Sequence, residues 1–235
     1  MSFIKFKDHI AIIEPILKNI YTDLKIKAIY VSPDKSITHR LLIFAAMAKG
    51  ESIIYNPSTC LDCINTLNII QNLGINFSIY KTTIHKKIIN VLKLKSPGIN
   101  NLKLKTKVLY FGNSGTGARI LIPLLSTIPT IKCVCTGDKS LSTRPMDRVV
   151  TPLIEVGAQI SLTRYQYLPI KIKGKNISKG ITYKYNLPSA QVKSAIIISA
   201  LNINAKSCII LPSKGRDHTE YILKHNLNAP IHVTK

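Results

Sequence analysis

The segment Gly112-Asn113-Ser114-Gly115-Thr116-Gly117-Ala118-Arg119 stands between a strand-like run and a long apolar run. The run before it, 108–111, is typical of a strand, and the apolar residues after it recur at helical spacing. Ser114 is a favoured N-cap residue, because its hydroxyl can accept a hydrogen bond from a free N–H of the first helical turn. The segment therefore predicts a strand, a tight turn and a helix that begins at Ser114.

The same pattern occurs three times along the chain. Ser36, Ser114 and Ser189 each precede an apolar helix, a short β-branched strand and a second helix. The three strands are predicted at 52–55, 131–135 and 207–211, and the second helices at 62–73, 146–156 and 217–224. Further extended segments are predicted at 77–80, 88–92 and 170–172. We therefore expect an α/β (α+β) fold in which three similar units are related by a pseudo-threefold axis.

The three helix openings carry groups that bind anions. PDKSITHR at 33–40, GNSGTGAR at 112–119 and PSAQVK at 188–193 each combine a hydroxyl or amide side chain with a cation. Free N–H groups and the helix dipole favour phosphate or carboxylate at a helix N-terminus, and Lys or Arg adds charge-assisted hydrogen bonds. Each opening alone could be an ordinary N-cap with a solvated cation. Three in register favour an anion site at one end of the domain.

The glycines of the second opening do not match a nucleotide-binding loop. The spacing from Gly112 to Gly117 after a strand fits that loop. However, Ala118 and Arg119 stand where the pattern requires Lys and then Ser or Thr. Without the Lys and the magnesium-binding hydroxyl, we do not expect an NTPase.

The cysteines leave two interpretations open. The pair Cys60-x-x-Cys63 could be half a zinc site, but no second Cys-x-x-Cys and no paired His completes it. Cys133 and Cys135 alternate along a strand-like apolar run. Ordinary reduced thiols and no bound metal are the expectation.

The charge of the chain is strongly positive. Lys and Arg number 33 against 11 Asp and Glu, and the stretches 63–137 and 156–216 contain no acidic residue. Such a field favours an anionic partner, either nucleic acid or a small phosphate ester. Most of the cations are Lys in a chain that is also rich in Ile and Asn, a bias that requires no binding role. The absence of Trp, aromatics at only 6% and the lack of a groove-reading motif argue against specific nucleic-acid binding.

The N-terminal residues show no targeting or spanning segment. No apolar run approaches the roughly 18 residues of a membrane helix. Residues 1–20 mix charged with apolar side chains, unlike a secretory signal. We expect a cytoplasmic protein without membrane contact, in which residues 1–27 form an N-terminal arm of uncertain role.

Five motifs occur in the order and spacing of one enzyme family: PDKSITHR at 33–40, FGNSGTGAR at 111–119, GDKSLSTRPMDR at 137–148, PSAQVKSA at 188–195 and GRDHTE at 215–220. On these motifs the chain resembles the 5-enolpyruvylshikimate-3-phosphate synthases, or 3-phosphoshikimate 1-carboxyvinyltransferases. The resemblance implies transfer of the enolpyruvyl group of phosphoenolpyruvate to the 5-hydroxyl of shikimate 3-phosphate, with release of phosphate and no cofactor. This is a step of the shikimate pathway to chorismate and the aromatic amino acids. It also implies an inverse α/β barrel of three βαββαβ units.

The resemblance implies binding residues as well. Those expected to bind shikimate 3-phosphate are Lys35, Ser36, Arg40, Ser189, Ala190, Gln191 and Arg216. Those expected to bind phosphoenolpyruvate are Lys35, Asn113, Gly115, Arg144 and Gln191. The chain departs from the family at Gly215, where many members have a Ser that helps to bind shikimate 3-phosphate.

Family members are two-domain proteins of roughly twice this length. The resemblance therefore implies that 28–235 form the first domain and that the second, which supplies the acid–base groups, is missing. Asp62, Asp217 and Glu220 lie near predicted helix N-termini and are interpreted as caps, so we expect no independent activity. A separately encoded second domain could be the partner. The alternatives are a non-catalytic anion-binding remnant and a basic nucleic-acid-binding protein.

Overall fold

The computed structural model describes residues 10–13, 29–30, 33–84, 87–184, 189–210, 216–227 and 229. The first unit comprises β2 (Ile29–Tyr30), α2 (Lys35–Met47), β3 (Lys49–Tyr55), α3 (Leu61–Asn72), β4 (Asn76–Ile84) and β5 (Lys87–Pro97), followed by a 3-10 turn (Ile99–Asn101). The second comprises β6 (Val108–Tyr110), α4 (Gly115–Ser126), β7 (Lys132–Thr136), α5 (Lys139–Ser142), α6 (Asp147–Glu155), β8 (Gln159–Thr163) and β9 (Tyr167–Lys173). The third comprises β10 (Thr182–Lys184), α7 (Ala190–Ala200), β11 (Ser207–Ile210) and α8 (His218–Tyr221), which continues into a π-helical turn (Ile222–Asn226).

Each unit builds one sheet, and the sheets share a topology. The strand orders are β2-β3-β5-β4 in the first sheet and β6-β7-β9-β8 in the second. In both, the first pair is parallel and the other pairs are antiparallel. In the third sheet β10 is parallel to β11, while β1 (Ile10–Ile13) is antiparallel to β11. Part of the N-terminal arm therefore takes the place that β5 and β9 occupy in the other sheets.

The threefold repetition is confirmed, but the order of elements within a unit differs from the one implied by the resemblance. One strand, not two, lies between the two helices of a unit, and in the first two units an antiparallel hairpin follows the second helix. The described strands form three separate sheets, without continuous pairing around a closed barrel. Residue 211, the predicted end of the third strand, and Gly215 lie outside the described part of the chain.

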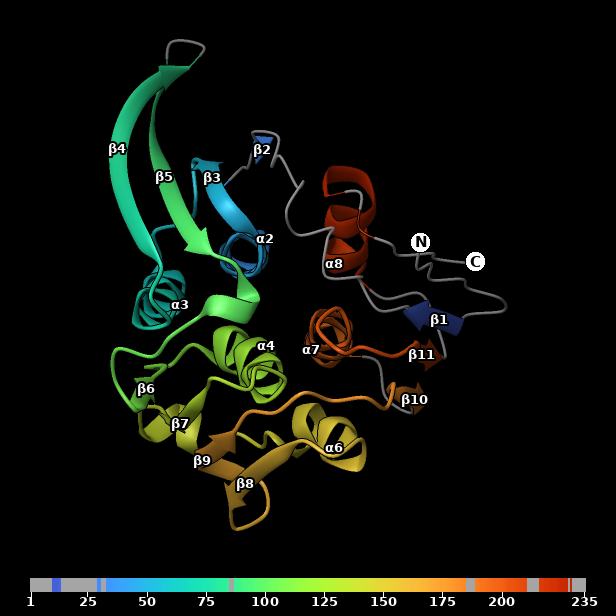
Figure 1. Cartoon of the computed structure of the whole chain (residues 1–235). Helices are drawn as coiled ribbons and strands as arrows, with labels where there is room; N and C mark the ends of the chain where they lie inside the picture. The colour runs from blue at the N-terminus through green and yellow to red at the C-terminus, as the bar shows by residue number, and fades with distance from the viewer. Residues whose placement is uncertain are drawn as a thin grey trace.

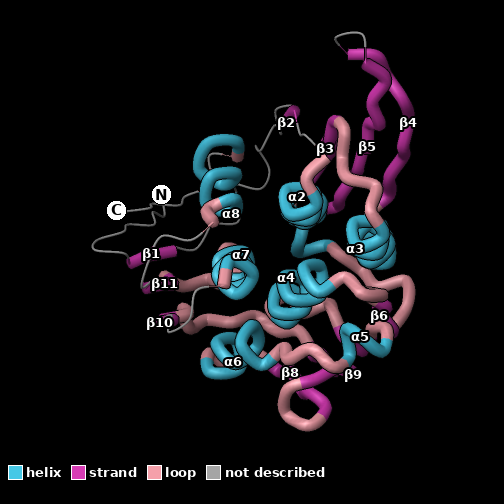
Figure 2. Tube along the Cα trace, turned by 180° about the vertical axis from the view of Figure 1, so that it is seen from behind, coloured by secondary structure: helices cyan, strands magenta, loops and turns pink. Residues whose placement is uncertain are grey.

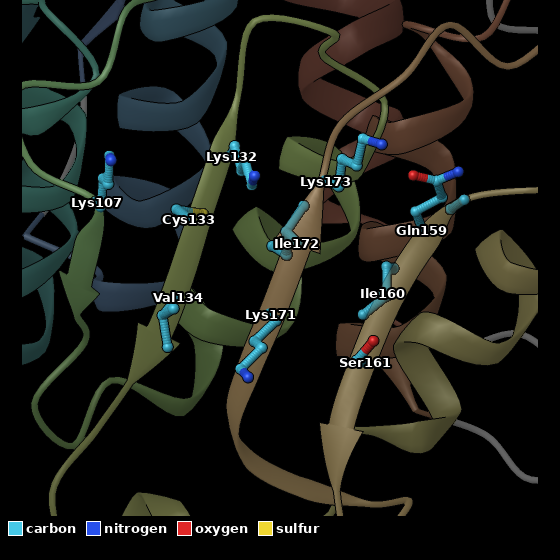
Figure 3. A pocket seen from close by; sticks show the side chains of 11 residues that line it. Lys107, Lys132, Cys133, Val134, Gln159, Ile160, Ser161, Lys171, Ile172 and Lys173 are labelled. Carbon is cyan, nitrogen blue, oxygen red and sulfur yellow. The ribbon is translucent and has the colours of Figure 1, made fainter.

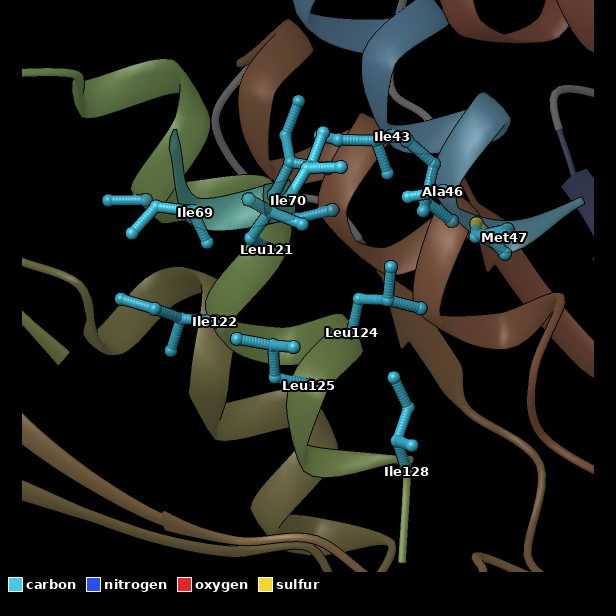
Figure 4. Packing of buried hydrophobic residues seen from close by; sticks show 14 of the residues in the cluster. Ile43, Ala46, Met47, Ile69, Ile70, Leu121, Ile122, Leu124, Leu125 and Ile128 are labelled. Carbon is cyan, nitrogen blue, oxygen red and sulfur yellow. The ribbon is translucent and has the colours of Figure 1, made fainter. Parts of the chain in front are cut away.

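The three repeated helices α2, α4 and α7 lie inside, and the sheets lie outside them. Figure 1 shows these helices nearly end on at the centre, and Figure 2 shows the same arrangement from behind. A helix covered on all sides must be apolar on all sides. In α4, Ile120, Leu121, Ile122 and Leu125 are each at most 1% exposed. Figure 4 shows side chains of α4 packing with Ile43 and Ala46 of α2 and with side chains of α3.

The starts of these helices fix the binding surface. Ser114 accepts a hydrogen bond from Gly117 N and Ser189 accepts one from Val192 N, so both predicted caps are confirmed. The prediction for Ser36 is wrong: the cap of α2 is Asp34, whose Oδ1 accepts from Ile37 N at 2.7 Å. A carboxylate is the stronger acceptor at the positive end of the helix dipole, so the helix begins earlier. Ser36 therefore belongs to the first turn of α2.

Two further observations concern the whole described chain. None of its helices is both long and apolar enough to cross a membrane. Its five cysteines are free, and the described residues contain no cluster of three His, Cys, Asp or Glu side chains that could hold a metal ion.

Candidate functional site

Two guanidinium groups converge beside the first turn of α4. A Cβ atom at position 115 would lie 3.1 Å from Nη1 of Arg119 and 3.1 Å from Nη1 of Arg144. Glycine has no Cβ, so it leaves this space open and lets both cations approach the helix N-terminus. The predicted residues Gly115 and Arg144 therefore lie together, and Arg119 joins them.

The acceptors that hold these two cations are neutral. Arg144 Nη2 donates to Asn113 Oδ1 at 2.7 Å and to Ser140 Oγ at 3.0 Å. Arg119 donates to Gln191 Oε1 at 3.1 Å and to the carbonyl of Pro145 at 3.4 Å. In the described part of the chain, neither guanidinium forms an ion pair with a carboxylate. Burial, and then the charges of Arg144 and Arg148, lower the pKa of Arg119. An anion bound here would relieve that repulsion.

The third helix opening contacts the second. Gln191, in the first turn of α7, accepts from Arg119 and donates through Nε2 to Thr116 Oγ1 at 3.0 Å. Ser189 caps α7 and Ala190 is its first residue. The predicted residues of the second and third openings therefore lie around one position.

The first opening places Lys35 at the surface. Its Nζ lies 2.9 Å from Oδ2 of Asp62 in the first turn of α3. The hydrogen bond and the charge of Asp62 raise the pKa of Lys35. Asp62 is therefore the ion-pair partner of Lys35 and not simply a helix cap, which the sequence did not show. Half of the Lys35 side chain is exposed, at 50%, so it can reach a ligand.

Arg40 lies deeper than the sequence suggested. It is 3% exposed. Its Nε donates to Thr219 Oγ1, its Nη2 to Ser194 Oγ and its Nη1 to the carbonyl of Ser36, each at 2.7 Å. Burial lowers the pKa of Arg40, while the charge of Glu220 opposes that shift. The guanidinium thus joins α2, α7 and α8, and its direct contact with a ligand stays a prediction.

Helix α8 supports the first and third openings. Glu220 Oε1 pairs with Lys193 Nζ of α7 at 2.5 Å, with both side chains almost fully buried. The interpretation of Glu220 as a cap is therefore wrong, because sequence spacing cannot show that its side chain turns inward. Thr219, Ser194 and Lys193 are supporting residues that sequence reasoning missed, although they lie within the GRDHTE and PSAQVKSA motifs. Arg216 is exposed just before α8.

A separate cavity of about 600 Å³ lies on the second sheet, away from the helix openings (Figure 3). Its basic lining residues are Lys107, Lys132, Lys171 and Lys173. Lys132 and Lys173 are directly opposite each other on β7 and β9. In the first sheet, by contrast, Lys93 forms an ion pair with Glu51 at 3.0 Å. We refer to these four lysines as the lysine face. The amide of Gln159 and the hydroxyl of Ser161 also line this cavity, but none of its lining residues lies at a helix N-terminus, unlike the groups around Gly115.

Comparisons with known proteins agree with this arrangement. The model of the family EPSP synthase (3-phosphoshikimate 1-carboxyvinyltransferase) matches residues 22–235. The 3-phosphoshikimate 1-carboxyvinyltransferase of Staphylococcus haemolyticus is 41% identical over 206 residues, which are 88% of this chain and 45% of that protein. The same enzyme of Thermotoga neapolitana is 41% identical over 203 residues, or 86% of this chain and 45% of that protein. The chain spans about half the length of the curated relatives it matches.

Solved structures give the same result. The EPSP synthase of Acinetobacter baumannii superimposes with a TM-score of 0.72 at 34% identity, covering 84% of this chain and 43% of that one. The enolpyruvyl transferase NikO of Streptomyces tendae has a TM-score of 0.51 at 12% identity and covers 87% of this chain and 45% of that one, which bears on the fold alone. With a family model that matches the chain from residue 22 onward and the motif residues gathered at adjoining helix openings, the chain belongs to the EPSP synthase family.

Proposed function

We propose that this chain binds shikimate 3-phosphate and phosphoenolpyruvate, and that together with a second domain it transfers the enolpyruvyl group between them with release of phosphate. The observation that carries the proposal is the pair of guanidinium groups, Arg119 and Arg144, at the N-terminus of α4 beside Gly115. Like charges held together without a carboxylate partner are unfavourable unless an anion binds between them.

Phosphoenolpyruvate suits the second opening. It carries a carboxylate and a phosphate, and the planar fork of Arg binds either group through two hydrogen bonds. Arg144 is already oriented by Asn113, and Arg119 by Gln191. We propose that Arg144, Asn113, Gly115 and Gln191 contact phosphoenolpyruvate, with Lys35 approaching from the first opening.

Shikimate 3-phosphate suits the first and third openings. The ammonium of Lys35, the hydroxyls of Ser36 and Ser189, and the backbone at the start of α7, where Ala190 and Gln191 lie, suit the phosphate and hydroxyl groups of this substrate. We propose that Arg40 acts mainly by positioning Ser36, because it donates to the Ser36 carbonyl. Arg216, exposed beside α8, could reach the same ligand.

We propose that the proton-transfer groups come from a second domain. Asp34 caps α2, Asp138 caps α5 and Asp62 pairs with Lys35, so each of these carboxylates near the openings already has a partner. Addition of the 5-hydroxyl to the double bond of phosphoenolpyruvate needs a proton donor and a base in reach. Phosphate itself is the leaving group, so the reaction calls for no cofactor. The five free thiols support a reducing, cytoplasmic location.

Replacing Arg144 by Lys tests the proposal. Lysine keeps the charge but cannot form the planar fork, so phosphoenolpyruvate affinity should fall by about tenfold or more, since one charge-assisted hydrogen bond contributes about 1.5–3 kcal/mol. Ligand-detected NMR with shikimate 3-phosphate present measures this affinity. The matched control is Arg164→Lys, because Arg164 is exposed in the β8–β9 turn. Equal affinity in wild type and Arg144→Lys would refute the proposed site.

A further inference from the structure

The two cysteines of the Cys60-x-x-Cys63 motif lie in one turn at the N-terminus of α3. Cys60 is the N-cap residue, and Cys63 is the third residue of the helix, whose N–H donates to the Cys60 carbonyl at 2.9 Å. The Cys60 side chain makes no capping hydrogen bond to the first turn of the helix. It lies close to the Cys63 side chain instead, since each thiol influences the other through a side-chain hydrogen bond. Cys60 is half-buried, whereas Cys63 is 2% exposed.

The two thiols differ in acidity. Burial acts to raise the pKa of Cys60, but the polar groups of Ser58 and Cys63 outweigh it, so the net shift is downward. Burial, and then the neighbouring Cys60, raise the pKa of Cys63 to about 12. A thiolate is the nucleophile in thiol–disulfide exchange, and an accessible thiol at a helix N-terminus forms it more readily than a buried one. The chain thus has an accessible attacking thiol beside a buried second thiol.

We propose that Cys60 and Cys63 form a redox-active dithiol, which low-molecular-weight disulfides such as glutathione disulfide convert into an intramolecular disulfide. The Cys60 thiolate attacks one sulfur of glutathione disulfide, forming a mixed disulfide and releasing one glutathione thiolate, which takes up a proton. Cys63 then loses its proton to solvent and attacks the Cys60 sulfur, expelling the second glutathione. The two protein thiols are oxidised, and the disulfide is reduced to two molecules of glutathione.

The dithiol is connected to the first helix opening. Cys63 Sγ donates to the carbonyl of Lys35 at 3.7 Å, and Asp62, between the two cysteines, pairs with Lys35 Nζ at 2.9 Å. Formation of the disulfide removes the Cys63 thiol proton, and with it the hydrogen bond that the backbone carbonyl of Lys35 accepts. We therefore expect oxidation to weaken the binding of shikimate 3-phosphate, a consequence that rests on the proposed function.

The chain contains an internal comparison. Cys133 and Cys135 also have neighbouring sulfurs, 3.9 Å apart, but both lie in the core on β7. The neighbouring Cys133 and burial raise the pKa of Cys135 well above its usual value. These two thiols are close to each other but inaccessible, so we expect no exchange there in the folded chain.

Mass spectrometry of the folded chain treated with glutathione disulfide tests the proposal. Wild type should lose the mass of two hydrogens, with the new bond mapped to Cys60 and Cys63 and reversed by dithiothreitol. Cys63→Ser should instead retain one glutathione at Cys60, because the second step is blocked. Cys60→Ser should form neither product at these positions, and the control Cys208→Ser should behave like wild type.

Two results would overturn the proposal that Cys60 and Cys63 form a redox-active dithiol. One is a Cys60→Ser chain that takes up glutathione as fast as wild type, and the other is a wild-type chain that keeps the mixed disulfide without closing it. Serine is nearly isosteric with cysteine and is a good N-cap residue, so these variants should fold. As a second measurement, alkylation of Cys60 by iodoacetamide should show a midpoint below the pKa of an ordinary cysteine thiol, and a midpoint above it would contradict the proposal.

Calorimetry with shikimate 3-phosphate separates this inference from the proposed function. Reduced chain should bind several-fold more tightly than oxidised chain. Equal affinity in the two states would disprove the connection to Lys35. A chain that forms the disulfide but binds shikimate 3-phosphate in neither state would support the dithiol and refute the proposed function.

Discussion

His39 is a buried titratable residue directly behind the anion site. Its Nδ1 lies 2.9 Å from Thr66 Oγ1, which in turn lies 3.5 Å from Oγ of Ser114, the cap of α4. The other ring nitrogen is buried without a hydrogen-bond partner among the described residues. Burial lowers the pKa of His39 to about 4, so the ring is neutral at neutral pH. A charged imidazolium in this position would be poorly solvated.

This burial predicts a pH dependence of stability. An unfolded His has a pKa near 6.5, so below that pH the unfolded chain binds a proton that the folded chain does not. The stability that comes from the buried, neutral His39 ring is fully present above about pH 6.5. It is lost as the pH falls toward the pKa of His39 in the folded chain, about 4. Between about pH 7.5 and about pH 4 we expect the free energy of unfolding to fall by about 2–3 kcal/mol because of His39. Urea unfolding of wild type and His39→Asn measures it, and the same pH slope in both chains would contradict the assignment.

The arginines show how far individual residues can be interpreted from sequence. Arg144 could be predicted only through the family resemblance of its motif, GDKSLSTRPMDR at 137–148. Arg40 could be placed in the first opening but not in the core, because its burial depends on Ser194 and Thr219, which are distant in sequence. The resemblance placed Gly115 and Arg144 at one ligand, whereas the participation of Arg119 beside Gly115 was shown only by the folded structure.

Among the elements, local sequence patterns predicted the positions of the long helices, but the strands of the hairpins were predicted too short. The second helix of the first unit was predicted within a residue of its observed bounds, Leu61–Asn72. Strands β4 and β5 extend well beyond the predicted 77–80 and 88–92, because each gains its length by pairing with the other along Asn76–Ile84. The short helix α5 was not predicted, because four residues are too few to show helical periodicity.

The start of α2 gives a prediction at the level of the element. Because Asp34 provides the cap, Asp34→Ala should lower the free energy of unfolding by about 0.5–2 kcal/mol. Ser36→Ala should leave it nearly unchanged, since alanine is a good residue within a first turn. Thermal or urea unfolding of the two variants makes the comparison. If Ser36→Ala lost more free energy of unfolding than Asp34→Ala, Ser36 and not Asp34 would be the N-cap residue.

For the whole molecule, repetition made the architecture predictable. Three serine-led openings at similar intervals indicated three units, and the described sheets repeat one topology. The pairing of β1 with β11 could not be predicted, because it joins residues at opposite ends of the chain through backbone hydrogen bonds that leave no local pattern. Likewise, the contact of the second and third openings through Gln191 requires the folded arrangement.

The central claim is that the three helix openings form one site for anionic substrates, whereas the lysine face does not. Titration of an equimolar mixture of shikimate 3-phosphate and phosphoenolpyruvate into isotope-labelled chain, followed by NMR of the backbone amides, tests it most directly. We predict that the amides of Lys35, Gly115 and Gln191 shift together along one saturation curve, while those of Lys132 and Lys171 stay in place. Shifts concentrated on Lys132 and Lys171, with the three openings unchanged, would contradict the account.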